Sequence, residues 1–302
     1  MLSAALVFST APLFYGQTLA PRAYVITPVD STAITVTSDL RHGGVLFDES
    51  TPITDSSGTI WLNSPTYYHS LDFFGRSSNI TAGLPYVVSS FKALVVDQRL
   101  STYRSGLGDG AVRFSVNLMG GPAMKLPEFE KWKQKRILGA SLLVQVPTGQ
   151  YDPRLLLNIG TNRWAIKPEV GYSERHGKWL TDVYGSVLFF TKNPEFFSRN
   201  KFVPGTQSKT QEPIEVVEGH LSYDFKPRLW FSLDGNFWYG GRSSINGVEN
   251  RATLQKNSRV GATAAIPITE RESLKFSYDR GALIRFGGNF QSVQVAWQYS
   301  WT

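Results

Sequence analysis

The sequence predicts an all-β protein, an antiparallel up-and-down β-barrel of about twelve strands that spans a membrane. Three observations predict it. The last segment, residues 290–302, alternates an apolar, aromatic face with a polar, uncharged face, and Trp301 stands next to its end. Similar alternating segments recur along the chain, joined in turn by short and long connections. The chain also carries 19 Phe, 13 Tyr and 8 Trp, which suffice for aromatic girdles at two membrane interfaces.

The final segment carries the clearest pattern. Side chains on a strand point alternately to its two faces. One face presents Val293, Val295, Trp297, Tyr299 and Trp301, and the other presents Ser292, Gln294, Ala296, Gln298 and Ser300. We expect lipid on the first face and water on the second, as in the closing strand of an outer-membrane barrel. Residues 293–301 are then the segment that the barrel-assembly machinery contacts.

Composition narrows the class further. The 302 residues are 41% hydrophobic and 18% charged, with a mean hydropathy of −0.19; this value suits a soluble protein, but alternation hides the apolar residues of a membrane barrel. The chain has no cysteine, which excludes disulfides and thiolate metal sites. The net charge is +7, without any five-residue basic run. We therefore expect outer-membrane lipid and lipopolysaccharide as partners and no nucleic acid, although a solvated basic surface explains the charge equally well. The loop cations expected to meet lipid are Arg41, Arg99, Arg104, Arg199, Lys201 and Lys209.

The amino terminus predicts export. Residues 2–15 form an apolar run of the length of a signal-peptide core, too short to span a bilayer as a helix. We predict a signal peptide over residues 1–20, cleaved near residues 16–20, and a single barrel domain over residues 21–302. The alternative is that this run forms a first strand.

Twelve alternating segments follow. They are residues 32–40, 59–74, 79–89, 111–118, 136–147, 163–173, 178–190, 215–225, 229–239, 258–268, 273–286 and 289–301. The even number is typical of bacterial single-chain barrels.

The connections predict which end of the barrel lies outside. Short turns are expected at residues 75–78, 174–177, 226–228 and 269–272, and long loops at residues 42–58, 91–110, 148–162, 191–213 and 240–257. Short turns lie in the periplasm and long loops outside, which places both termini in the periplasm. There are two exceptions, a tight outer hairpin at 285–289 and a long inner connection at 119–134. Within the latter, Pro127 and the sequence LPEFEKWKQK predict one short interfacial helix.

The alternation also assigns the inner face. An Arg or Lys at the bilayer midplane costs about 2–4 kcal/mol, so charged residues must face the lumen. The predicted channel-lining residues are Arg113, Arg163, Lys167, Glu169, Asp182, Tyr184, Glu218, His220, Trp230, Asp234, Trp238, Arg259, Lys275, Asp279 and Arg285. Because both signs occur, a ladder of salt bridges is favoured over a selectivity filter, which needs a ring of one sign. A soluble two-sheet sandwich would reverse the two faces.

Several stretches resemble a known family. They are PRAYVITPV at 21–29, GGVLFD at 43–48, SGLGD at 105–109, PTGQYDP at 147–153, NIGTNRWAIKPEVG at 158–171, GHLSYDF at 219–225, NSRVGATAAIPI at 257–268 and VAWQYSW at 295–301. With these stretches the chain resembles the MetA-pathway of phenol degradation family. The resemblance implies a monomeric barrel in the outer membrane of a Gram-negative bacterium, through which small hydrophobic or aromatic compounds are taken up.

The expected bore is narrow or plugged, because twelve strands lie between the filled eight-stranded barrels and the open sixteen-stranded ones. A hydrophobic solute would follow Trp230, Trp238 and Tyr184 and could leave sideways into the bilayer. Residues 17–28 are long enough to cover the periplasmic mouth.

Two other functions remain open. The spacing of His220 and Ser222 resembles that of outer-membrane phospholipase A, and Asp234 is expected opposite His220. A lipase must present its nucleophile to lipid, however, whereas these residues face the lumen, so a His–Asp pair in the ladder is favoured. The third possibility is a structural or adhesion barrel that transports nothing. No metal site or cofactor is predicted, since His42, His69, His176 and His220 share no ligand spacing and no nucleotide motif occurs in its required context.

Overall fold

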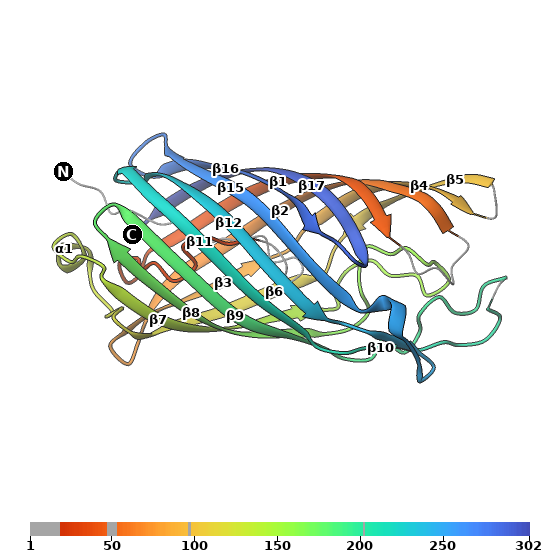
Figure 1. The fold of residues 1–302 in the computed structure, drawn as a ribbon. Coiled ribbons are helices and arrows are strands. Elements are labelled where there is room, and N and C mark those ends of the chain that lie inside the picture. Colours follow the sequence, from red (N-terminus) through yellow and green to blue (C-terminus); the bar gives the residue numbers. More distant parts are fainter. Residues whose placement is uncertain (1–18, 47–52, 96–97, 202) are drawn as a thin grey trace.

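The chain forms a closed antiparallel barrel of twelve staves, as predicted (Figure 1). The computed structural model describes residues 19–46, 53–95, 98–201 and 203–302. Most of the predicted signal peptide, residues 1–18, lies outside the described residues, as do parts of the expected loops 42–58, 91–110 and 191–213.

Fourteen strands make the twelve staves, because β3 and β4 follow each other in one stave and β5 and β6 in the next. Their bounds are β1 Thr32–Leu46, β2 Ile53–Phe73, β3 Arg76–Gly83, β4 Tyr86–Val95, β5 Gln98–Leu107, β6 Gly110–Met119, β7 Arg136–Val146, β8 Ala165–His176, β9 Trp179–Phe190, β11 Ile214–Lys226, β12 Leu229–Gly240, β15 Gln255–Pro267, β16 Glu272–Leu283 and β17 Gly287–Trp301. Pairing of β1 with both β17 and β2 closes the ring. A small separate sheet contains β10 (Lys209–Gln211), β13 (Ser243–Ile245) and β14 (Val248–Asn250), and a 3-10 turn, η1 (Arg251–Thr253), follows it.

The two ends of the barrel differ. The end that carries the C-terminus and α1 is called the turn end here, and the end that carries β10 is called the loop end (Figure 1). The four predicted short turns lie at residues 74–75, 177–178, 227–228 and 268–271. At the loop end, two of the expected loops were wrong. Much of the loop expected at residues 42–58 is strand, because β1 runs on to Leu46 and β2 starts at Ile53. In place of the loop expected at residues 91–110, β4 and β5 form a long hairpin. β5 is exposed along most of its length and its sequence QRLSTYRSGL lacks apolar alternation, so the sequence pattern indicated a loop.

The inner connection contains the predicted helix in shorter form. Helix α1 spans only Leu126–Phe129, with Pro127 in its first turn, and Trp132 lies beyond it. A helix of one turn is marginal by itself. Phe129 and Trp132 pack against a buried cluster inside the barrel, and this packing supports the short helix.

The faces of the strands are those expected. Leu221, Phe231 and Val295 are 43%, 39% and 37% exposed on the outside, whereas Glu218 and Asp234 are 2% and 6% exposed on the inside. This order excludes the soluble sandwich, whose apolar face would be buried. Among the described residues, no helix has the length and apolar character needed to cross a membrane.

The assignment of the outer face to lipid can be tested by substitution. Leu233 is 57% exposed in β12, and Leu233→Arg should lower the free energy of unfolding by about 2–4 kcal/mol, because an Arg would enter hydrocarbon. Denaturant titration in phospholipid vesicles measures this cost. Val248→Arg is the matched control, since Val248 is exposed in β14 at the loop end. An equal cost for both variants would contradict the assignment of the outer face.

Candidate functional site

A belt of paired charges lines the middle of the lumen. Lys167 Nζ lies 2.9 Å from Glu169 Oε2 and 3.4 Å from Glu218 Oε1, and Arg113 reaches Glu169 Oε1 at 3.3 Å. These side chains come from β6, β8 and β11 and are almost fully buried. Because both signs are present and paired, the belt acts as a brace between staves.

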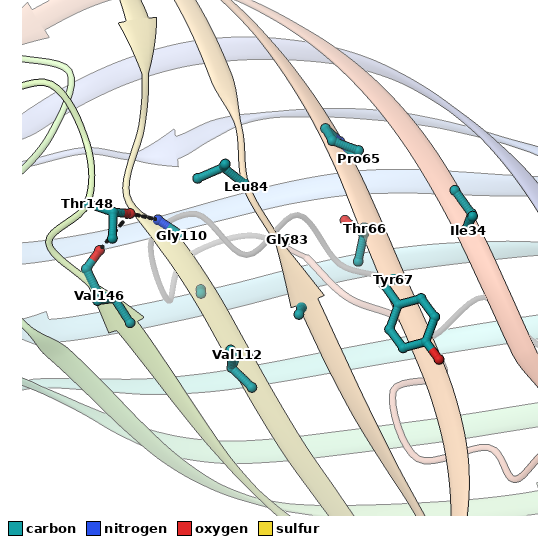
Figure 2. Close-up of a pocket in the computed structure, with 12 residues that line it drawn as sticks. Ile34, Pro65, Thr66, Tyr67, Gly83, Leu84, Gly110, Val112, Val146 and Thr148 are labelled. Carbon is teal, nitrogen blue, oxygen red and sulfur yellow. Dashed lines mark hydrogen bonds between the residues drawn. The ribbon is translucent and has the colours of Figure 1, made fainter.

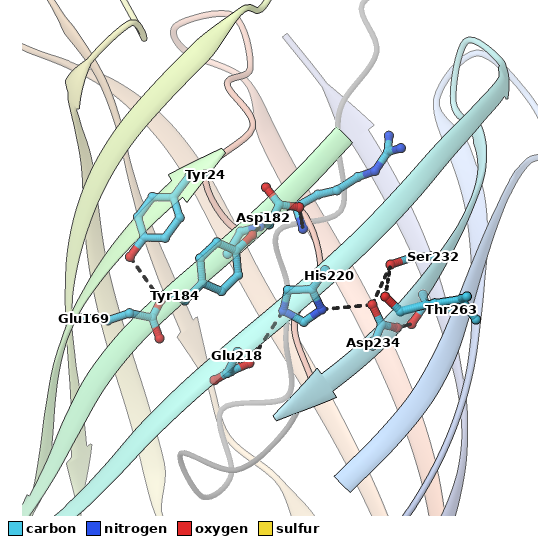
Figure 3. Close-up of polar contacts among 12 residues, drawn as sticks. Tyr24, Glu169, Asp182, Tyr184, Glu218, His220, Ser232, Asp234 and Thr263 are labelled. Carbon is cyan, nitrogen blue, oxygen red and sulfur yellow. Dashed lines mark hydrogen bonds and ion pairs between the residues drawn. The ribbon is translucent and has the colours of Figure 1, made fainter. Parts of the chain in front are cut away.

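The belt continues through His220 to Asp234. His220 Nδ1 lies 2.9 Å from Asp234 Oδ1, between directly opposed residues of β11 and β12, as the turn register predicted (Figure 3). Asp234 also accepts from Thr263 Oγ1 at 2.7 Å and from Ser232. Ser222 Oγ is buried without a hydrogen-bond partner, so the nucleophile-to-base contact of a hydrolase is not made. The geometry is that of a structural hub.

The remaining predicted lumen residues separate into two groups. Arg259 pairs with Asp279 at 3.0 Å, Asp182 accepts from Ser173, and Lys275, Trp230 and Trp238 are buried on the inner wall. Two others lie at the loop end. Arg163 stacks 4.2 Å from the Phe190 ring and donates to Gln211, and Arg285 is exposed in the connection after β16. The predicted strands were too long, since β8 starts at Ala165 and β16 ends at Leu283. Arg163 and Arg285 therefore lie in the connections next to these strands.

A segment ahead of β1 crosses the lumen in the half nearer the turn end. We call residues 19–31 the crossbar; residues 22–28 are buried. At one side Arg22 pairs with Asp224 at 2.7 Å and lies 4.3 Å from the centre of the Trp230 ring. At the other side Thr27 Oγ1 lies 2.7 Å from Tyr68 Oη. We expected residues 17–28 to cover the mouth; the described part, residues 19–28, instead lies inside the ring of strands (Figure 1).

The inner connection contacts the crossbar at the turn end. Met124, Phe129 and Trp132 pack against a cluster that includes Ile26 of the crossbar and Ile137 of β7. The amide of Val29 donates to the carbonyl of Met124 at 2.8 Å. The crossbar is therefore held both by the barrel wall and by the inner connection.

Apolar side chains gather toward the loop end of the inner wall. One cluster, from β9, β11 and β12, contains Leu188, Ile214, Val216 and Trp238. A second cluster joins β2 and β4 through Leu62 and Val87, and Ile60 of β2 and Ile159 of the loop 147–164 pack against it. The lumen is thus charged at its middle and apolar toward the loop end.

Three of the sequence motifs meet at one buried carboxylate. Asp109, between β5 and β6, accepts from the amides of Gly149 and Thr161, each at 2.9 Å, from Thr161 Oγ1 at 2.6 Å and from Gln145 Nε2 at 3.0 Å. It comes from SGLGD, Gly149 from PTGQYDP and Thr161 from NIGTNRW. Asp109 therefore fastens the loop 147–164 to the wall, a role that the glycine-rich character of its own motif does not indicate.

An apolar groove of about 610 Å³ lies at the wall next to this point. Ile34, Tyr67 and Val112, from β1, β2 and β6, line it with their outward side chains (Figure 2). Pro65 and Leu84 also line it. Pro65 and the neighbouring Pro85 lack an N–H and cannot donate to the ladder, so the wall has fewer ladder hydrogen bonds here.

The loop cations have varied surroundings. Arg41 pairs with Asp39 and is nearly buried, Arg99 pairs with Asp55, and Arg199 pairs with Glu195. Lys209 in β10 lies 4.7 Å from the centre of the Phe196 ring. Burial, and to a lesser extent Arg163, lower the pKa of Lys209 to about 8.

Two sets of residues at this site were missed in the sequence. Arg22 and Tyr24 attach the crossbar to the barrel wall, and Asp109 attaches the loop 147–164 to it. One signal was available: Gly139 and Gly171 fall at inward positions of two strands, and a glycine inside a strand often marks a close approach. No group of three or more His, Cys, Asp or Glu residues in the described part of the chain could hold a metal ion.

Comparisons with known proteins agree with this architecture. The COG4313 outer membrane channel from Pseudomonas putida F1 superposes with a TM-score of 0.75 at 18% identity, over 93% of this chain and 99% of that one. The transport unit of the autotransporter AIDA-I from Escherichia coli gives a TM-score of 0.53 at 11% identity, over 90% of both chains. These likenesses show the fold. No curated protein matches the sequence.

A family model supplies the identity of the chain. The model described as "Putative MetA-pathway of phenol degradation" matches residues 48–302, which include all the motifs from SGLGD onward. This range covers far more than half of the chain. The protein therefore belongs to the MetA-pathway of phenol degradation family, and its fold is that of an outer-membrane channel.

Proposed function

We propose that the protein is a monomeric channel of the Gram-negative outer membrane, through which small hydrophobic or aromatic compounds are taken up. One observation carries the proposal. The lumen is crossed by the crossbar, which is held by non-covalent contacts to the wall and is not itself a stave. Release of such a segment would widen the path through the barrel, which suits a channel, whereas a purely structural barrel needs no releasable segment.

The lining supports hydrophobic cargo. Trp238, Leu188 and Val216 form an apolar wall toward the loop end, and the charges beyond them are neutralised in pairs. A solute that leaves sideways would reach lipid at the apolar groove beside Pro65. In this proposal the turn end faces the periplasm, the loop end meets lipopolysaccharide, and residues 293–301 contact the assembly machinery.

Solute uptake tests the proposal. Hydrophobic compounds cross phospholipid easily, so the protein should be placed in vesicles whose outer leaflet is lipopolysaccharide. We expect phenol or toluene to enter faster than into vesicles without protein. Uptake no faster than in empty vesicles, both for the native protein and for a variant with a displaced crossbar, would favour a structural or adhesion barrel. Ser222→Ala with unchanged esterase activity would remove the hydrolase alternative.

A further inference from the structure

The side chain of Tyr24 occupies a recess built by the barrel wall. Its ring lies against Gly139 and Gly171, which are directly opposed in β7 and β8. A Cβ at Gly139 would come within 2.1 Å of Tyr24 Cδ1, and one at Gly171 within 2.1 Å of Tyr24 Cε2. The Tyr184 ring meets it edge-on at 5.3 Å. The two glycines therefore form a flat floor that admits an aromatic ring, and Tyr184 borders it on one side.

The same recess also contains hydrogen-bond partners for the hydroxyl group of Tyr24. Tyr24 Oη lies 3.0 Å from Glu169 Oε1 (Figure 3). It also lies 3.2 Å from Ser141 Oγ. Lys167 and Arg113 bind Glu169 and keep its carboxylate in place as an acceptor. Since a buried carboxylate prefers a donor to a hydrocarbon, the recess distinguishes a phenol from a plain benzene ring.

All of these wall groups belong to staves. Arg113, Ser141, Glu169 and Tyr184 lie on β6, β7, β8 and β9. The wall therefore supplies the groups of the recess, and the crossbar contacts one of them through the amide of Ala23, which donates to Tyr184 Oη at 3.0 Å. Tyr24 is 1% exposed and fills it. We propose that this recess is a binding site for small monocyclic phenols, that Tyr24 occupies it as a tethered ligand, and that a phenol from solution releases the crossbar by taking the place of Tyr24.

The attachment of Tyr24 to the crossbar sets the phenol concentration that is needed to displace it from the recess. A group on a short flexible linker has an effective concentration of about millimolar. Arg22 and Thr27 hold the crossbar at further points, so release should need phenol at about millimolar concentration or above. Its meaning for uptake rests on the proposed function, but binding itself can be measured separately.

Binding to a variant with an emptied recess is the direct test. In Tyr24→Ala, p-cresol, which is the side chain of tyrosine, should bind in calorimetry of the purified barrel. Toluene lacks only the hydroxyl and should bind about tenfold or more weakly, because it makes no bond to the carboxylate. Adding Gly171→Val should abolish p-cresol binding. Adding Gly185→Val should not, since nothing lies within 4 Å of a Cβ there.

A second measurement uses the otherwise native protein. The chain has no cysteine, so Ile26→Cys places a single thiol in the buried crossbar. We expect millimolar p-cresol to accelerate its labelling by maleimide, and toluene at the same concentration to leave the rate unchanged. Equal effects of the two compounds, no binding to Tyr24→Ala, or binding that survives Gly171→Val would overturn the proposal. Binding without any solute uptake would leave the recess established and remove the channel function instead.

Discussion

Gly171→Val is expected to open the bore. Its Cβ would lie 2.1 Å from Tyr24 Cε2 and 2.8 Å from Tyr184 Cδ1, so the Tyr24 ring cannot keep its place. Overpacking of this kind costs about 1–3 kcal/mol. That free energy shifts the ratio of released to seated crossbar by about 5- to 150-fold, and the mean conductance of single barrels in planar bilayers should rise in proportion.

The control for this experiment is Gly219→Val. Gly219 lies in β11, and nothing is found within 4 Å of a Cβ built there. It therefore introduces the same residue into a strand without touching the crossbar. If both variants conduct like the native protein, the crossbar does not close the bore.

Asp109→Ala is expected to release the loop 147–164 from the wall. Asp109 is 2% exposed, and its carboxylate accepts from Gly149, Thr161 and Gln145. Hydrogen bonds to charged groups contribute about 1.5–3 kcal/mol each, and the donors left behind stay buried. Loss of even one such bond raises the open fraction of the loop about tenfold or more. Trypsin should then cut faster after Arg154, whose side chain is already 67% exposed.

Glu195→Ala serves as the control for the loop. Glu195 forms an exposed ion pair with Arg199 in the neighbouring connection, and such pairs contribute little. Cleavage after Arg154 should therefore keep its native rate in this variant. Equal rates in Asp109→Ala and the native protein would show that other contacts hold the loop.

The strands were predictable because each residue of a membrane-spanning strand must be apolar where it faces lipid, whatever the rest of the chain does. Val217 and Leu221 face outward and Glu218 and His220 inward simply by position along one strand. The opposition of His220 and Asp234 was also predictable, from the turn expected at residues 226–228. In the structure the turn is residues 227–228, and a bulge between Asp224 and Lys226 gives the same pairing. β5 is largely exposed and its sequence does not alternate, so alternation could not predict the outer part of the hairpin of β4 and β5.

The contents of the lumen were not predictable in the same way. Tyr24 and Glu169 are separated by 145 residues, and no periodicity relates a segment inside the barrel to the wall it contacts. Asp109 and Thr161 likewise meet only because the loop folds back onto the wall.

The sequence by itself determined the barrel, its number of staves and the inward or outward direction of side chains within the predicted strands, because alternation within a strand is a local response to lipid on one side and water on the other. Only the tertiary structure decided that the bore is crossed, that Tyr24 lies over Gly139 and Gly171, and that Asp109 fastens the loop. Those contacts join residues far apart in the chain, and no local pattern relates their positions.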